Sequence, residues 1–244
     1  MIKINNLTKK YKDKLAVDNL NLEIKTGELF SLLGTNGAGK TTTIKMLSTL
    51  ILPTSGEVEI NNLDLVKDSS KIKEIINISP QETAVASNLT VLENLYFMAG
   101  IYQTPNKEDK IKELIKLFKL EEVLKQKAKT LSGGYQRKLS IAISLINNPK
   151  ILFLDEPTLG LDVISRHDLW KVIEALKGKT TIILTTHYME EAEVLSDRIG
   201  IMNKGKLIEL GTSKELIKKA KTKNFEDAFI KIIEEDNNEN TNIC

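Results

Sequence analysis

Four short, mainly apolar runs recur along the chain and predict strands that are buried on both faces. They cover residues 29–33, 75–79, 151–154 and 180–185. Segments with helical character separate them, including residues 40–50, the stretch that follows Leu131, and residues 165–176. Because parallel strands need long crossover connections, this alternation predicts an α/β fold with a mostly parallel sheet and helices on both faces.

The N-terminal region has a different pattern, in which apolar and polar residues alternate. Ile2 and Ile4 alternate with polar residues, as do Leu20, Leu22 and Ile24. Residues 56–65 predict a further short strand pair. We expect these segments to form a separate antiparallel β subdomain at the N-terminus.

Between the second and third buried strands the pattern becomes helical. Thr90 and Glu93 have the spacing of a capping box before an apolar run. Residues 111–124 are amphipathic, with Ile111, Leu114 and Phe118 on one face. We therefore predict a helical subdomain at about residues 83–131, inserted into the α/β domain.

The last part of the chain predicts a hairpin followed by helices. Residues 198–210 form the hairpin pattern, with its turn at 203–205, and a second capping box at Thr212–Glu215 opens a helix pair that extends to Ile233. The end, from Glu234 to Cys244, is polar and acidic, and we expect it to be frayed. We place the main domain at residues 1–220 and a C-terminal helix with its tail at 221–244.

Composition narrows the possible functions. The chain has 244 residues, 41% of them hydrophobic, and a net charge of +2 from 35 basic and 33 acidic residues, which gives no argument for nucleic-acid binding. Its single cysteine, Cys244, excludes an internal disulfide and a cysteine metal cluster. No apolar run approaches 18 residues, so we expect a cytoplasmic protein that reaches a membrane only through a partner.

A phosphate-binding motif follows the first buried strand. Gly34, Gly39, Lys40 and Thr41 fit G-x-x-x-x-G-K-[ST], with a strand before and a helix after it. Glycines at 34, 37 and 39 let backbone N–H groups surround phosphate oxygens at a helix N-terminus. Lys40 can then reach the β- and γ-phosphates of a nucleotide, and the Thr41 hydroxyl can bind Mg²⁺.

Polar residues follow two further buried strands. Asp155 and Glu156 come directly after residues 151–154, and His187 follows residues 180–185. Ligands of such sheets bind at the carboxyl ends of the strands, so these side chains should share one site with the P-loop. One carboxylate can hold Mg²⁺ and the next can activate a water, whereas His187 taken alone could equally be a packed helix-cap residue.

A second glycine-rich helix start lies at Ser132-Gly133-Gly134, far from the P-loop in sequence. Its backbone N–H groups and hydroxyl would form another phosphate cradle. A single P-loop site does not need one. Two copies arranged head-to-tail about a two-fold axis would use it, because each cradle would then close over the other copy's nucleotide.

With LSGGYQRKLSIA, ILFLDEPTLGLD and TTH in this order, the chain resembles the nucleotide-binding subunits of ATP-binding cassette (ABC) transporters over essentially its whole length. The resemblance implies an ABC ATPase fold with ATP and Mg²⁺ as cofactors. It also implies that Glu156 is the general base, that His187 senses the γ-phosphate, and that Lys40 and Gln81 complete the catalytic set. Thr41, Gln81 and Asp155 would approach Mg²⁺.

The remaining implied roles concern nucleotide binding. Tyr11, which alone we would take for an ordinary loop tyrosine, would stack on adenine, and Asp162 would communicate across the dimer. Ser132, Gly133 and Gly134 would clamp the γ-phosphate of the opposite subunit's ATP. The phosphates would be bound by Gly34, Thr35, Asn36, Gly37, Ala38, Gly39, Lys40, Thr41 and Thr42. Thr35 replaces a proline often found there, which we treat as neutral.

Residues near the end, DRIGIMNKGKLIELGTSKEL and NFEDAFI, resemble the branch that serves drug, antibiotic, lipid or polysaccharide exporters with a separately encoded permease. The expected partners are an ABC permease and a second ATPase subunit, identical or related, on the cytoplasmic face of the membrane; no nucleic acid is expected. Alternatives are an ABC protein that acts on ribosomes or DNA, a P-loop kinase, and a catalytically silent subunit. The transported substrate cannot be predicted from this chain.

Overall fold

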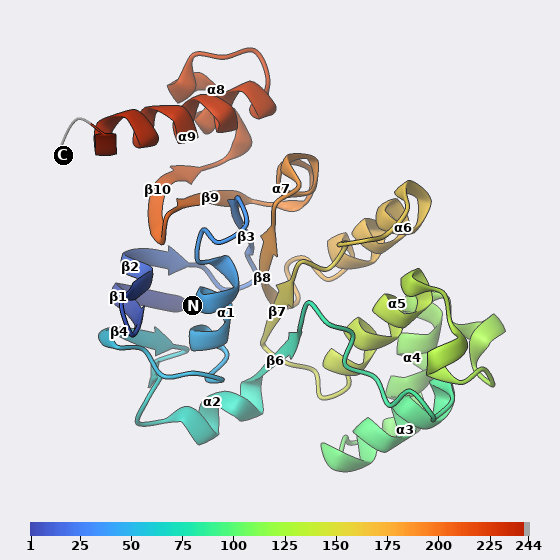
Figure 1. Ribbon diagram of the computed structural model, residues 1–244. Coiled ribbons are helices and arrows are strands. Elements are labelled where there is room, and N and C mark those ends of the chain that lie inside the picture. Colours follow the sequence, from blue (N-terminus) through green and yellow to red (C-terminus); the bar gives the residue numbers. More distant parts are fainter. Residues whose placement is uncertain (242–244) are drawn as a thin grey trace.

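The computed structural model describes residues 1–241 and contains two sheets with helices around them (Figure 1). The central sheet has the order β10-β9-β3-β8-β7-β6. Its strands β3, β6, β7, β8 and β9 are parallel, and β10 is antiparallel to β9. The strands of this sheet are β3 (Leu29–Gly34), β6 (Ile76–Ser79), β7 (Ile151–Asp155), β8 (Thr181–Thr186), β9 (Arg198–Asn203) and β10 (Lys206–Gly211). The predicted mostly parallel sheet is confirmed.

The second sheet is antiparallel and contains the N-terminal residues. Its order is β2-β1-β4-β5, and the register pairs Ile2 with Ile24 and Ile4 with Leu22. Its strands are β1 (Ile2–Tyr11), β2 (Lys14–Ile24), β4 (Ser55–Ile60) and β5 (Leu63–Asp64). The alternating residues face one core, which confirms the predicted antiparallel subdomain.

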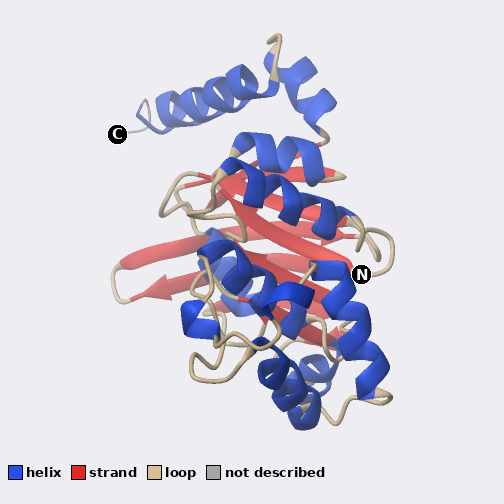
Figure 2. Ribbon diagram, turned by 90° about the vertical axis from the view of Figure 1, so that its right-hand side faces the viewer, coloured by secondary structure: helices blue, strands red, loops and turns tan. Residues whose placement is uncertain are grey.

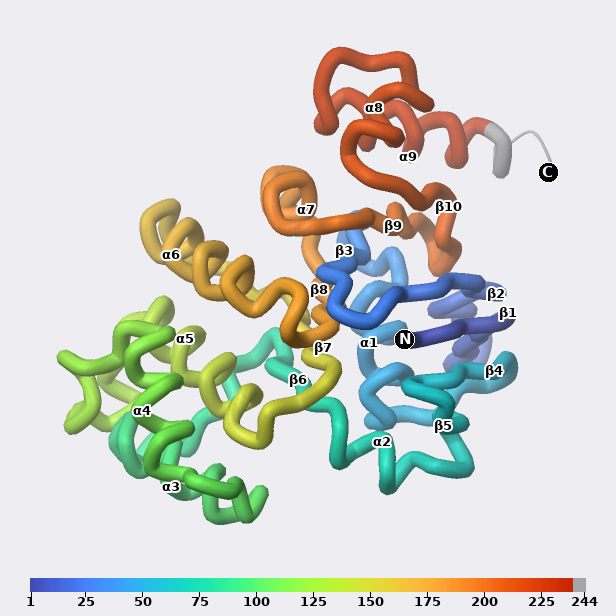
Figure 3. Tube along the Cα trace, turned by 180° about the vertical axis from the view of Figure 1, so that it is seen from behind, coloured from blue at the N-terminus to red at the C-terminus, as the bar shows by residue number. Residues whose placement is uncertain are grey.

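Helices cover both faces of the central sheet because its side chains alternate between two cores. Phe30, Phe153 and Ile183 pack with α1 (Lys40–Leu47), α2 (Ser69–Ile75) and the antiparallel sheet. Leu152 and Leu184 pack on the other side. The helices on that side are α3 (Val91–Ile101), α4 (Lys107–Phe118), α5 (Gly133–Ser144) and α6 (Val163–Glu174), with 3₁₀ turns η1 (Glu121–Val123) and η2 (Ala128–Thr130). Figure 2 shows helices lying across the sheet, and Figure 3 shows α3, α4 and α5 grouped away from β1, β2 and β4.

Two expected helix boundaries differ from those in the structure. The amphipathic helix α4 begins at Lys107 and ends at Phe118, not Leu124, because Lys119 takes a left-handed φ of 53° that closes the helix. The last helix, α9 (Phe225–Thr241), extends beyond Ile233 into the segment that we expected to be frayed. Cys244 lies outside the described residues.

The C-terminal helices pack against one edge of the central sheet. Phe225 and Phe229 of α9, and Leu216 of α8 (Ser213–Ala220), share a core with β9 and with α7 (Met189–Leu195). The Asn203 side chain at the end of β9 donates hydrogen bonds to Asp236 and Asn237 of α9. No helix within residues 1–241 combines the length and apolar character needed to span a bilayer.

Candidate active site

A cavity of about 430 Å³ lies where the carboxyl ends of the central strands meet the start of α1. The β1–β2 hairpin closes another side of it through Lys14 and Ala16. The residues that line this cavity are Lys14, Ala16, Asn36, Gly37, Ala38, Gly39, Lys40, Thr41, Thr42, Gln81, Glu156, Leu159 and His187. Segments that the sequence places far apart therefore share one site, as predicted for this edge of a parallel sheet.

In the loop between β3 and α1, close contacts with the backbone of the same chain require glycines. Gly39 has a φ of 103°, and a Cβ there would lie 2.6 Å from the Ala16 backbone oxygen. At Gly34 a Cβ would lie 2.4 Å from the Met202 backbone oxygen. Because both contacts are with backbone, a side chain at either position could not be accommodated by a small movement.

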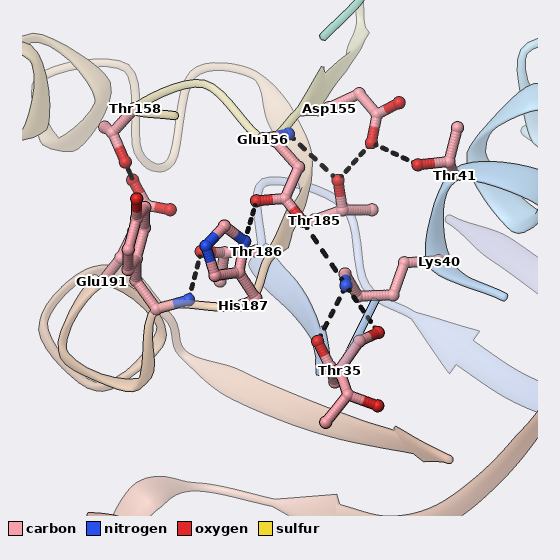
Figure 4. Close-up of polar contacts among 12 residues, drawn as sticks. Thr35, Lys40, Thr41, Asp155, Glu156, Thr158, Thr185, Thr186, His187 and Glu191 are labelled. Carbon is pink, nitrogen blue, oxygen red and sulfur yellow. Dashed lines mark hydrogen bonds and ion pairs between the residues drawn. The ribbon is translucent and has the colours of Figure 1, made fainter. Parts of the chain in front are cut away.

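Lys40 places a buried positive charge at the first turn of α1. Its Nζ donates hydrogen bonds to the backbone oxygens of Gly34 at 2.7 Å and Thr35 at 3.2 Å. The same nitrogen lies 3.4 Å from Oε1 of Glu156 (Figure 4). An ammonium held this way can neutralise phosphate charge without first losing a full hydration shell.

Asp155 is held by hydrogen bonds from two threonines, one on α1 and one on β8. Its Oδ1 accepts hydrogen bonds from Thr41 Oγ1 at 3.1 Å and Thr185 Oγ1 at 2.5 Å (Figure 4). These residues meet because β8 lies between β3 and β7. The role of Thr185 could not be read from the sequence alone, because it depends on the register of β8 against β7, which places Thr185 directly beside Asp155.

Glu156 reaches into the cavity from a strained backbone position. Its φ is 49°, which is unusual for a residue with a Cβ. Its backbone N–H donates to Thr185 Oγ1 at 3.1 Å, and its Oε2 lies 2.6 Å from His187 Nδ1. The carboxylate is thus held between His187 and Lys40 at the cavity wall, with only 6% of the residue exposed.

A second buried carboxyl group, Glu191 of α7, connects the loops behind this site. Its Oε1 accepts a hydrogen bond from Thr158 Oγ1 at 2.8 Å (Figure 4) and another from Trp170 Nε1 at 3.0 Å. Burial raises the pKa of Glu191, against the opposing effect of the hydrogen bonds from Thr158 and Trp170. Thr158 follows Glu156 closely along the chain, and Glu191 follows His187. The hydrogen bond between Thr158 and Glu191 therefore links the two segments that carry Glu156 and His187. Glu191 was not predicted as a site residue, because nothing in the sequence marks this helical glutamate as buried.

Several predicted site residues lie apart from this cavity. Tyr11 is at the end of β1, 44% exposed, with Lys9 Nζ 5.0 Å from its ring centre. Ser132 caps α5, and Asp162 caps α6 by accepting from the N–H groups of Ile164 and Ser165. The described residues that line the cavity do not include Tyr11, Ser132, Gly133, Gly134 or Asp162.

The starts of α5 and α6 adjoin one another. A Cβ on Gly134 would lie 3.0 Å from Ser165 Oγ, so this glycine permits the approach. Gly133 is different, because a Cβ there would meet no atom of another described segment within 4 Å and its φ is outside the left-handed region. Internal packing therefore does not explain why residue 133 is a glycine.

Comparisons with known proteins agree on the family. The family described as "ABC transporter" matches residues 17–159. The chain is 39% identical to the Escherichia coli protein named as a probable multidrug ABC transporter ATP-binding protein, YbhF, over 99% of this chain and 43% of that protein. It is 43% identical to human phospholipid-transporting ATPase ABCA3 over 87% of this chain but only 13% of that protein. It is 40% identical to the linearmycin resistance ATP-binding protein LnrL of Bacillus subtilis, over 88% and 70%.

Solved structures have the same fold. An ATP-binding subunit of an ABC transporter superimposes with a TM-score of 0.85 at 26% identity, over 95% of this chain and 99% of that chain. A dimeric ATP-binding cassette, MJ0796, bound to ADP and Pi gives 0.78 at 31% identity, over 87% and 98%. Since the family match covers more than half of the chain and its motifs meet in one cavity, the chain belongs to the ABC transporter family, as an ABC ATPase domain.

Proposed function

We propose that this chain hydrolyses ATP with Glu156 as the general base. The observation that carries this proposal is the position of the Glu156 carboxylate, on the wall of the phosphate-loop cavity and 2.6 Å from His187. A base must lie within hydrogen-bond reach of the water it deprotonates, and Glu156, directly after β7, lies 3.4 Å from Lys40 of the P-loop. His187 would orient this carboxylate and contact the γ-phosphate, and Gln81 would position the water.

The residues present are suitable ligands for MgATP. The Thr41 hydroxyl and the Asp155 carboxylate are 3.1 Å apart, and Gln81 lines the same cavity. Hydroxyl, carboxylate and amide oxygens are the hard donors that Mg²⁺ prefers, with waters and phosphate oxygens filling its other positions. Bound Mg²⁺ would offset charge on the β- and γ-phosphates. Tyr11, at the rim hairpin beside Lys14 and Ala16, is our proposal for the adenine contact.

Glu156→Gln tests the base directly. The amide keeps the size of the side chain but cannot accept the proton of the attacking water, so the ATPase rate should fall by about 10²- to 10⁴-fold. Nucleotide affinity should change little, because Lys40 and the loop 34–42 remain. Phosphate release and binding of a fluorescent ATP analogue measure the two effects. A Glu156→Gln protein that hydrolysed ATP at the wild-type rate would contradict the assignment.

We propose further that two chains pair head-to-tail, with Ser132–Gly134 of each closing over the ATP of the other. Gly133 supports this arrangement, because no contact within the described chain requires residue 133 to lack a side chain. A ligand approaching the start of α5 from outside would require it. Asp162 begins the neighbouring helix, so it would face the same interface. The cassette MJ0796, a structural relative, is itself a dimer.

The pair would drive a separately encoded permease from the cytoplasmic face of the membrane, in the direction of export. Exposed apolar side chains on α3, namely Tyr96, Phe97 and Ile101, offer an attachment surface on the helical side of the molecule. Export is supported by the names of relatives, which include a resistance protein and a phospholipid transporter. The chain spans 13% of ABCA3 and 43% of YbhF, so their whole activities are not carried over.

A pull-down of tagged Glu156→Gln protein from its own cells, in mild detergent with MgATP, tests the permease. We expect a protein with several membrane-spanning segments to co-purify. Phe97→Asp should reduce its recovery, whereas Val66→Asp, at another exposed apolar position, serves as the control. Recovery of ribosomal proteins or DNA without a membrane protein would contradict the transporter function.

A further inference from the structure

Arg137 of α5 is a buried guanidinium that connects three separate segments. Only 5% of the residue is exposed. Its Nη1 donates to the backbone oxygens of Pro80 at 2.5 Å and Gln81 at 3.3 Å. Its Nε donates to the oxygen of Pro157 at 2.7 Å, and Nη2 donates to the backbone oxygen of Asp155 at 2.8 Å. The side chain thus joins α5 to the loop after β6 and the loop after β7.

This contact needs the geometry of arginine. A guanidinium has five N–H donors in a planar fork and can bind carbonyls on two sides, whereas a lysine ammonium is a single point with three donors. Burial lowers the pKa of Arg137 to about 10, while Asp155, Glu191 and Glu156 oppose that effect, so the group stays charged at neutral pH.

The four carbonyls belong to the segments that carry the predicted chemistry. Gln81 lines the cavity, and Glu156 lies between Asp155 and Pro157. At its other end Arg137 sits on the second turn of α5, which begins with Ser132, Gly133 and Gly134. A second contact runs in parallel, because Ser140, one turn further along α5, lies 3.2 Å from Ser79 at the end of β6 (Oγ to Oγ).

We propose that Arg137 is a positioning residue that couples the nucleotide site of its own chain to the cradle at Ser132–Gly134. This inference rests on the proposed head-to-tail dimer, in which that cradle closes over the partner's nucleotide. Movement of Gln81 or Glu156 on binding a γ-phosphate would be transmitted through the guanidinium to the start of α5. The two sites of a dimer would then act cooperatively, with each Arg137 carrying the signal from one site to the other.

The test compares Arg137→Lys with Leu145→Ala, which removes buried packing at the other end of α5. Lysine keeps the charge but cannot bind both loops. We expect its ADP affinity to stay within about twofold, since the P-loop is untouched. Its ATPase rate should fall by about 10- to 100-fold, as for a small misplacement of reacting groups. Its Hill coefficient for ATP should fall from the wild-type value, at most about 2 for two sites, to about 1. Leu145→Ala should lower thermal stability and keep the Hill coefficient.

Contradicting results can be assigned to one proposal or the other. If Glu156→Gln dimerises with MgATP but Arg137→Lys keeps the wild-type rate and Hill coefficient, the coupling role is wrong and the dimer stands. If Glu156→Gln stays monomeric, both proposals fail.

A spectroscopic measurement avoids any substitution at Arg137. With three arginines in the chain, the Arg137 Nε–H resonance can be assigned in protein with labelled arginine. MgATP should shift it relative to MgADP, because the γ-phosphate moves its carbonyl partners. Identical spectra in the two states would overturn the proposal.

Discussion

The chain contains two glycine-rich helix starts, and they use their glycines for different reasons. At the start of α1, a Cβ on Gly34 or Gly39 would lie only 2.4 or 2.6 Å from a backbone oxygen, and Gly39 also has a positive φ. At the start of α5, Gly133 has an ordinary φ and open space. The first start is shaped by its own chain, whereas contacts within the described chain do not require the glycine at the second.

The polar groups around the two starts differ in the same way. Lys40 and Thr41 at the first start are bonded to Gly34, Asp155 and Glu156 of the same chain. In the described structure, the Ser132 side chain at the second start only caps its own helix, through a hydrogen bond of 3.4 Å. A site that is preorganised on one side and open on the other fits the sharing of one nucleotide between two chains.

The largest effect on folding should come from Gly39→Ala. The added Cβ would take a positive φ and approach the Ala16 oxygen, and together these should lower the free energy of unfolding by about 3 kcal/mol or more. Urea unfolding measures this change. Gly37→Ala is the matched control, because its φ is also positive at 83° but its Cβ meets nothing, so about 1 kcal/mol is expected. Equal losses at the two positions would show that the close approach does not matter.

An intermediate effect is expected from Glu191→Gln, behind the first start. At pH 5 the change should be about 1 kcal/mol or less, because an amide oxygen can accept the same hydrogen bonds from Thr158 and Trp170. Burial raises the pKa of Glu191 above its ordinary 4.5, so the folded state binds a proton that the unfolded state releases. Wild-type stability therefore falls as pH rises from about 4.5 through the raised value. Glutamine does not titrate, so the variant does not lose stability in this way. Its free energy of unfolding should therefore increase relative to that of the wild type as the pH rises.

Urea unfolding from pH 5 to 8 compares the two proteins. Parallel pH profiles would contradict the raised pKa. Glu190→Gln on the same helix is the control, because Glu190 is exposed and should leave the pH dependence unchanged.

The smallest effect on folding should come from Gly133→Ala at the second start. Open space and an ordinary φ allow the methyl group, so the free energy of unfolding should change by no more than about 0.5 kcal/mol. ATP-dependent dimerisation should weaken nonetheless, which sedimentation in the Glu156→Gln background would detect. A clear loss of stability would mean that the chain itself needs this glycine, and the contrast between the two starts would disappear.

Much of the architecture could be predicted because strand ends carry their own signals. The apolar runs before Gly34, Asp155 and His187 place these residues at one edge of a parallel sheet, and the structure brings Lys40, Glu156 and His187 into one cavity. The turn between β9 and β10 could also be predicted from the sequence. In the structure, Lys204 and Gly205 both take positive φ, as in a two-residue hairpin.

The supporting contacts could not be predicted from the sequence. Thr185, Glu191 and Arg137 act through partners that are distant along the chain, and no local pattern marks a charged helix residue as buried. The length of α9 was also missed, because its polar end is held by the contact of Asn203 with Asp236 and Asn237, which depends on tertiary packing. Composition alone indicated a frayed end there.

Mixing two inactive proteins shows whether one active site is built from two chains. Lys40→Ala removes the phosphate contact of the first start, and Gly133→Asp places a carboxylate at the second. A mixed dimer of these variants has one composite site with both defects and one with neither. If the site is shared, ATP hydrolysis should reappear on mixing, whereas a protein that carries both changes should stay inactive when mixed with either single variant. If the mixture is as inactive as its components, the shared site is wrong.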